Sequence, residues 1–132
     1  MKPSIHYLKY RLGLEAPITQ TSIAERDTLK EFASGKNRIA EIGVFHGVNT
    51  LTFREVMATD AALIAIDPFE RSFFGIRGYG WARRIAHREV LKSNNGSVVW
   101  IEDFGSKTPS RQDVKHLLPV DFIFIDGDHS WE

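Results

Sequence analysis

The chain has 132 residues, which is enough for one domain with a hydrophobic core but short for a doubly wound sheet enzyme. Its 17 basic and 17 acidic residues cancel, so the overall charge gives no reason to expect a nucleic acid or an anionic membrane as partner. The sequence contains no cysteine, which excludes disulfides, thiolate zinc sites and cysteine nucleophiles.

Residues 1–20 show no clear hydrophobic period, and their two prolines favour an irregular or partly helical lead-in. They also lack the continuous apolar run of a signal peptide or a transmembrane helix, so we expect a cytoplasmic protein with no membrane partner. Ser22 and Glu25 then have the spacing of a capping box. They predict a helix that ends at Gly35.

Residues 38–50 are predicted to form a buried strand that turns through glycines into a helix. The run from Ile39 to Ile42 lacks polar alternation, which is typical of a parallel strand covered on both faces. Gly43 and Gly47 follow it, and glycine suits a turn with positive φ or a close approach to a ligand. Because the next helix begins here with free N–H groups, the turn suits a nucleotide-like ligand.

Strands and helices alternate along the rest of the chain. We expect a helix from Asn49 or Thr50 to Ala58, a strand over 61–66, a helix over 82–92, a strand over 98–101, a helix from Pro109 to Leu118 and a strand over 120–125. This alternation predicts an α/β, Rossmann-like fold of three layers, a parallel sheet with helices on both faces. The glycine-rich, aromatic segment 69–81 is either a substrate-facing lid or a loop packed on the domain.

Asp67 stands at the end of the second expected strand, about twenty positions after the glycine turn. An acid in this place can accept both ribose hydroxyls of a nucleotide, as it does in dinucleotide enzymes. The alternative is an aspartate that caps a turn before Pro68. A dinucleotide motif needs another glycine where this chain has Glu41, and a Walker loop needs the sequence Gly-Lys-Ser/Thr, which is missing.

The pattern Glu41-Ile-Gly43-x-x-x-Gly47, together with Asp67, resembles the first motif and the strand-two acid of class I S-adenosylmethionine-dependent methyltransferases. The resemblance implies that Glu41, Gly43 and Gly47 form the turn that holds the methionine part of the cofactor, and that Asp67 binds its ribose. It also implies that Asp103, after the third strand, contacts the adenine amino group.

A second motif, Asp126-Gly-Asp-His-Ser-Trp-Glu, ends the chain. It resembles the segment after strand four in small-molecule O-methyltransferases of the macrocin and catechol types, in which the first aspartate of metal-dependent members binds a divalent cation. The resemblance implies that Asp126 is a ligand of Mg²⁺ and that His129 is the catalytic base, where catechol-type enzymes carry lysine. The alternative is a loop whose carboxylates cap the next helix.

We therefore expect a methyltransferase that passes a methyl group from S-adenosylmethionine to a hydroxyl of a small-molecule acceptor. One alternative is an NAD(P)-type Rossmann oxidoreductase, which shares the sheet and Asp67. Another is a non-catalytic cofactor- or RNA-binding module that uses the basic and aromatic segment 71–92, although the balanced charge makes nucleic acid an unexpected partner.

The number of expected strands is four, whereas the resemblance implies a seven-stranded sheet of order 3-2-1-4-5-7-6. We therefore expect residues 1–132 to form a single, partial methyltransferase domain, the N-terminal part of a longer protein. The other expectation is a homo-oligomer that pairs through the edge of the fourth strand, because residues 122–125 are apolar and an open apolar edge is a template for association.

Overall fold

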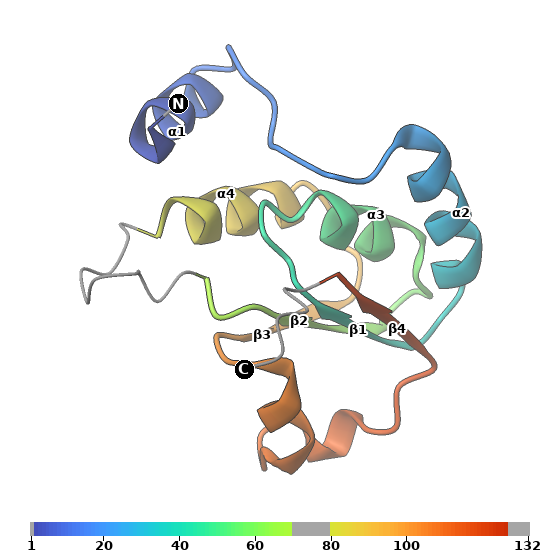
Figure 1. The fold of residues 1–132 in the computed structure, drawn as a ribbon. Coiled ribbons are helices and arrows are strands. Elements are labelled where there is room, and N and C mark those ends of the chain that lie inside the picture. The colour runs from blue at the N-terminus through green and yellow to red at the C-terminus, as the bar shows by residue number, and fades with distance from the viewer. Residues whose placement is uncertain (1, 70–79, 127–132) are drawn as a thin grey trace.

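The computed structural model describes residues 2–69 and 80–126 (Figure 1). Most of the segment 69–81, expected to be a lid or a packed loop, lies outside the described residues. His129, the expected base, lies outside them as well. Within the described part of the chain no helix is both long and apolar enough to cross a membrane.

Four parallel strands form one sheet in the order β3-β2-β1-β4. The strands are β1 (Arg38–Ile42), β2 (Ala62–Ile66), β3 (Ser97–Ile101) and β4 (Phe122–Ile125). Each of the four was expected to within two residues, and the predicted Rossmann-like α/β fold is confirmed. Because the strands are parallel, their carboxyl ends lie at the same edge of the sheet.

The α-helices of the described residues lie on one side of this sheet (Figure 1). They are α1 (Pro3–Arg11), α2 (Ile23–Ala33), α3 (Val48–Val56) and α4 (Trp81–Val90). The predicted capping box of α2 is confirmed. The Ser22 hydroxyl accepts the N–H of Glu25 at 3.2 Å, and the Glu25 carboxylate accepts the N–H of Ser22 at 2.7 Å.

The lead-in is partly helical, one of the two forms that the sequence favours, because α1 takes up 9 of its residues. Pro3 stands in its first turn, where proline is tolerated. The helix is anchored on α4 by a buried hydrogen bond from the Tyr10 hydroxyl to Glu89 at 2.6 Å. The rings of Tyr7 and Trp81 also lie 4.8 Å apart. These contacts with α4 explain why no local pattern in 1–20 revealed the helix.

Two other expectations about helices were wrong. The capping residue of α3 is Gly47, not Asn49 or Thr50. The α-helix expected from Pro109 to Leu118 is replaced by two 3₁₀ helices, η1 (Gly105–Ser110) and η2 (Lys115–Leu117).

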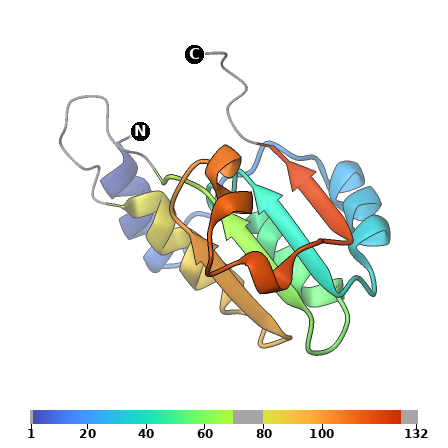
Figure 2. The same cartoon turned by 90° about the horizontal axis from the view of Figure 1, so that it is seen from below.

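The spacing of the apolar residues around η2 does not distinguish the two kinds of helix. Val114 and Leu117 are three positions apart, which puts them on one side of an α-helix and of a 3₁₀ turn alike. Both pack against the face of the sheet that the α-helices leave open, which Figure 2 shows from below. Pro109 disfavours an α-helix here, because it lacks the N–H that an α-helix needs in its interior.

The sheet separates two hydrophobic clusters. The one under the α-helices is centred on Phe53, whose ring meets Phe122 and Phe124 edge-on at 5.4 and 5.6 Å. On the other face of β4, Ile123 and Ile125 are 50% and 54% exposed. Among the described strands β4 is therefore an open apolar edge, and association through it stays a prediction.

Candidate functional site

A cleft of about 450 Å³ opens at the carboxyl ends of β1, β2 and β4. Three of the residues expected at the site line it, namely Gly43, Asp67 and Asp126. Much of its wall is formed by residues 18–20 and 43–45. Asn49, in the first turn of α3, lines it as well. We call it the glycine-turn cleft.

The turn after β1 is tied to the end of β2 by Asp67. One carboxylate oxygen of Asp67 accepts the N–H groups of Val44 and Phe45, each at 2.8 Å. The other oxygen accepts the N–H of Phe69 at 2.7 Å. Phe45 has φ of +50°, a conformation that a bulky residue rarely adopts, and these bonds hold it there.

Asp67 therefore caps the turn, as the alternative interpretation of the sequence expected. A carboxylate has about four acceptor positions, so three backbone bonds leave capacity for a further donor. Its side chain is partly exposed and lines the cleft. The expected bond to a ribose hydroxyl is compatible with this geometry and stays a prediction.

Glu41 lies beneath the turn and not in the cleft wall, because its side chain is only 1% exposed. One oxygen accepts the hydroxyl of Thr50 at 2.5 Å, which joins β1 to the first turn of α3. The other oxygen is buried and has no partner among the described residues. Burial raises the pKa of Glu41 to about 8; the Thr50 bond opposes the rise, and the charges of Asp67 and Asp126 add to it. Glu41 is therefore mostly protonated at neutral pH and supports the turn from below.

Gly47, like Glu41, has a structural role, in this case in the packing of α4 against the turn. Its φ is +76°, and a Cβ added to it would lie 3.0 Å from the Cα and 3.1 Å from the carbonyl oxygen of Ala86. The residue is thus glycine because α4 packs against it. Gly43, with φ of +93°, is the glycine of the pair that lines the cleft.

The other two aspartates expected at the site have different settings. Asp103 follows β3, accepts the N–H of Phe104 at 2.8 Å and lies 3.7 Å from the Lys107 ammonium. It is not among the residues that line the glycine-turn cleft, and its contact with adenine stays a prediction. Asp126 lines the cleft and is exposed, with its N–H bonded to Ile42 at 2.8 Å.

Within residues 2–69 and 80–126, no group of three or more histidine or acidic side chains could hold a metal ion. The described residues thus supply only Asp126 to the expected Mg²⁺ site. The remaining candidates of that motif lie outside them.

The segment 18–21 belongs to the site, and sequence reasoning missed it. The N–H of Ile18 bonds to His46 Nδ1 at 2.9 Å, and the Thr21 hydroxyl bonds to Asn49 at 2.9 Å. Both pairs are 28 positions apart in the chain. No local pattern signals such contacts, although the place of Asn49 just after Gly47 could have marked it as a lining residue.

The basic face of α4, considered above for RNA, is engaged within the protein. Arg83 pairs with Glu102 and Lys92 with Glu89, while Arg84 and Arg88 lie over the rings of Trp81 and Tyr10. These contacts are those of a solvated helix face. They offer no support for an RNA-binding module.

Comparisons with known proteins agree with the fold. A family model described as a methyltransferase domain matches residues 40–132. Among solved structures, the chain is similar to the O-methyltransferase TomG from Streptomyces achromogenes, involved in tomaymycin synthesis and solved in complex with SAM, with 18% identity and a TM-score of 0.62. The match covers 96% of this chain and 54% of that one, so the chain spans about half of its length. The search of curated proteins found no match.

The raised pKa of Glu41 predicts a pH-dependent stability. Between its ordinary pKa of 4.5 and about 8, folded Glu41 binds a proton that the unfolded chain releases. Its contribution to the unfolding free energy is therefore present below 4.5 and is lost as the pH rises toward 8. Relative to Glu41→Gln, we expect the wild type to lose about 2–3 kcal/mol between about pH 5 and about pH 7.5 in urea unfolding.

The comparison with Glu41→Gln isolates this effect, because both proteins retain every other titrating group. His46 acts in the opposite direction: its pKa is lowered to about 4, so its contribution grows as the pH rises toward 6.5. Subtracting the stability curve of Glu41→Gln from that of the wild type removes the contribution of His46. Parallel stability curves for the two proteins would show that Glu41 is ionised in the folded state.

The contact of Gly47 with α4 predicts that Gly47→Ala is costly. Gly35 is a matched control, because it also has positive φ, +69°, but a Cβ there would meet nothing within 4 Å. We expect Gly35→Ala to lower the unfolding free energy by about 1–2 kcal/mol from backbone strain alone, and Gly47→Ala by about 2–4 kcal/mol. Equal losses in urea unfolding would mean that α4 moves aside without cost.

Proposed function

The chain belongs to the methyltransferase domain family, and on that premise we propose that it transfers a methyl group from S-adenosylmethionine to a hydroxyl of a small molecule. The proposed cofactor site is the glycine-turn cleft. Its volume is within the usual range of about 300–1,000 Å³ for ligand sites. The proposal concerns the whole protein, of which this chain holds the cofactor-binding strands.

One observation supports this cofactor over a dinucleotide. In dinucleotide enzymes the N–H groups of the glycine turn face the pyrophosphate. Here the N–H groups of Val44 and Phe45 are already bonded to the carboxylate of Asp67. A second acid, Asp126, lines the same cleft. Two carboxylates repel a pyrophosphate but favour the positive sulfonium and ammonium groups of S-adenosylmethionine.

In the proposed site, each residue of the turn has a separate task. Gly43 lets the backbone come close to the methionine part of the cofactor. Asp67 accepts a hydrogen bond from a ribose hydroxyl at the acceptor position that its backbone bonds leave open. Glu41 and Gly47 act indirectly, by fixing α3 to β1 and α4 to the turn. Asp103, at the end of the neighbouring strand β3, is placed on the side proposed for adenine.

S-adenosylmethionine supplies a methyl group on a positively charged sulfur. The acceptor oxygen forms a bond to that methyl carbon as the bond to sulfur breaks, and S-adenosylhomocysteine leaves. The acceptor proton passes to a base, for which we propose His129. Most of the rate gain in such a transfer comes from holding the oxygen and the methyl in line.

The proposed cofactor site predicts that Asp67→Ala weakens binding of S-adenosylhomocysteine by about tenfold to a hundredfold, because a hydrogen bond to a charged group contributes about 1.5–3 kcal/mol. Isothermal titration measures this. The matched control is Asp121→Ala: Asp121 also accepts two backbone N–H groups, those of Asn37 and Arg38, each at 2.9 Å, but at the opposite end of β1.

Asp121→Ala should lower the stability of the protein and leave the affinity unchanged. If both variants lost affinity alike, the effect of Asp67 would be one of folding only. An unchanged affinity in Asp67→Ala would remove that residue from the site.

The role proposed for Asp126 as a ligand of Mg²⁺ has its own test. Asp126→Asn should abolish turnover that depends on Mg²⁺ and leave the affinity for S-adenosylhomocysteine within about threefold, because a metal acts on the acceptor oxygen. Methyl transfer is measured with and without excess chelator. Full activity of the wild type in chelator would exclude the metal and leave His129 as the residue to test.

A further inference from the structure

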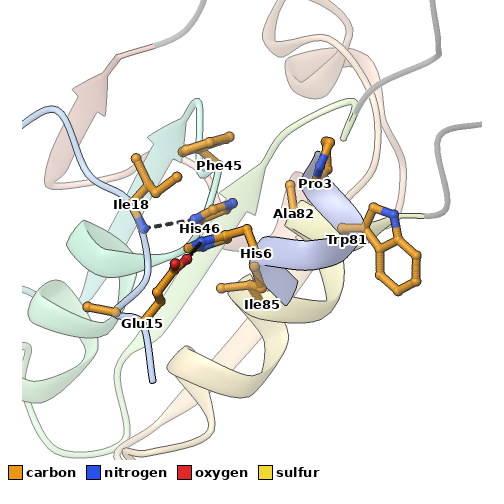
Figure 3. Close-up of a pocket in the computed structure, with 10 residues that line it drawn as sticks. Pro3, His6, Glu15, Ile18, Phe45, His46, Trp81, Ala82 and Ile85 are labelled. Atoms are coloured by element: carbon orange, nitrogen blue, oxygen red, sulfur yellow. Dashed lines mark hydrogen bonds and ion pairs between the residues drawn. The ribbon is translucent and has the colours of Figure 1, made fainter. Parts of the chain in front are cut away.

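The inner side of α1 is fixed to the rest of the protein. His6 lies in a second hollow, of about 460 Å³, lined by α1, the turn after β1 and the start of α4 (Figure 3). Its Nδ1 is 2.7 Å from a carboxylate oxygen of Glu15. Tyr10 is buried as well and bonds to Glu89 of α4. Because His6 and Tyr10 lie on one side of the helix, the opposite side of α1 faces away from the protein.

That outer side of α1 is apolar. Ile5, Leu8 and Leu12 follow one another at spacings of three and four residues, which places them in one row along the helix. Their exposed fractions are 46%, 60% and 65%. Leu14, just beyond the helix, is exposed as well. We call Ile5, Leu8 and Leu12 the outer apolar row, and none of the described residues buries it.

The surroundings of this row are basic, although the whole chain has no net charge. The segments 2–14 and 81–92 contain a single acid, Glu89, which is 3% exposed and already bonded to Tyr10 and Lys92. The same two segments contain seven of the 17 basic residues, namely Lys2, Lys9, Arg11, Arg83, Arg84, Arg88 and Lys92. The balanced charge of the chain therefore hides a local excess of positive charge on α1 and α4.

Four of these cations, Lys2, Arg11, Arg84 and Arg88, form no ion pair among the described residues, whereas the other three do. Arg11 stands next to Leu12 in the sequence and so flanks the outer apolar row. Arg88 lies over the ring of Tyr10 in α1, and Arg84 lies over Trp81, whose ring contacts Tyr7. A ring beneath a guanidinium leaves its charge in place, so these arginines border α1 as cations.

A partner for this face of the protein must be both apolar and negatively charged. RNA supplies the charge but no apolar surface for the row, and the rings of Tyr7, Tyr10 and Trp81 are already in contact with other side chains. A second copy bound through the same face would set its cations against those of the first. The surface of an anionic bilayer supplies both components, because an apolar helix face enters the boundary between headgroups and acyl chains while basic side chains contact the headgroups.

We propose that α1 docks on anionic lipid membranes, with the outer apolar row at the boundary between headgroups and acyl chains and with Lys2, Arg11, Arg84 and Arg88 on the headgroups. In this arrangement α1 lies in the plane of the membrane and does not span it. The sequence suggested no membrane partner because it lacks a long apolar run and its total charge is balanced. Neither property reveals a face built by two helices that are far apart in the chain. The docking does not depend on the methyl transfer proposed above.

Co-sedimentation with lipid vesicles measures the docking directly. We expect the protein to bind vesicles of phosphatidylcholine that contain about 30% phosphatidylserine, and to bind pure phosphatidylcholine at least about tenfold more weakly, because each basic residue contributes about fivefold at an anionic surface. Added salt should weaken the binding, since it screens exposed charges. Failure to bind the anionic vesicles, or equal affinity for the two kinds of vesicle, would overturn the proposal.

The outer apolar row is tested by the double variant Leu8→Gln/Leu12→Gln. Its matched control is Ile23→Gln/Phe32→Gln, because Ile23 and Phe32 are 72% and 62% exposed but stand on α2 among acidic residues. The first variant should bind the anionic vesicles at least about tenfold more weakly than the wild type, since its leucines no longer enter the apolar boundary. The control should bind as the wild type does. An equal loss in both variants, or no loss in the first, would contradict the docking of α1.

The role of charge is tested by Arg11→Gln, with Lys30→Gln as control. Both residues are exposed and stand in the last turn of a helix, Arg11 in α1 and Lys30 in α2. Arg11→Gln should weaken binding to the anionic vesicles about fivefold, and Lys30→Gln should not change it. Unchanged affinity in Arg11→Gln would exclude the proposed headgroup contact.

A fluorescent label identifies the docked face without removing the row. Because the chain contains no cysteine, Leu8→Cys and Phe32→Cys can each carry one NBD group. Emission from the label at position 8 should move to shorter wavelength when anionic vesicles are added, and emission from position 32 should not. A shift at position 32 alone would place the membrane on another face and overturn the proposal.

The same label distinguishes the other occupants of the face. A shift at position 8 that grows with protein concentration in the absence of vesicles would show that a second copy covers the row. A shift produced by soluble poly-glutamate, and equal to that produced by the anionic vesicles, would show that the face takes an acidic polymer. Either result would overturn the assignment to a membrane, whereas a shift that requires the vesicles supports it.

Discussion

The carboxylate of Asp67 holds together the part of the structure on which the site depends. It joins the end of β2 to the N–H groups of Val44 and Phe45, in a turn that contains a bulky residue at positive φ. Each hydrogen bond of this kind, to a charged group, contributes about 1.5–3 kcal/mol. The bond therefore sets the path of the chain between β1 and α3, and with it the shape of the cleft.

The same bond explains the electrostatic character of the cleft. Two N–H donors of the turn, those of Val44 and Phe45, are bonded to a carboxylate and are not available to an anion. Asp126 adds negative charge at the end of β4, and Glu41 beneath the turn stays protonated because burial and these acids disfavour its charge. The two carboxylates at its wall therefore give the cleft a negative character.

The turn also links the cleft to the N-terminal segment. Phe45 lines the cleft and a second hollow beside it, while His46 accepts the N–H of Ile18 and stacks beside His6. Any shift of the turn would therefore move walls of both hollows together.

The sequence by itself determined the strands, the capping box of α2 and the three residues that meet in the cleft, Gly43, Asp67 and Asp126. These features depend on local patterns and on the rule that parallel strands present their carboxyl ends at one edge. His129 and most of the segment 69–81 lie outside the described residues, and the expectations about them remain predictions.

Only the tertiary structure decided what long-range contacts control. It showed that α1 docks on α4, that Gly47 is needed for the packing of α4, and that Glu41 is buried below the turn. It also brought His6 of α1 beside His46. The physical reason is that each of these features depends on a surface supplied by a distant part of the chain, and composition or spacing within one segment carries no record of it.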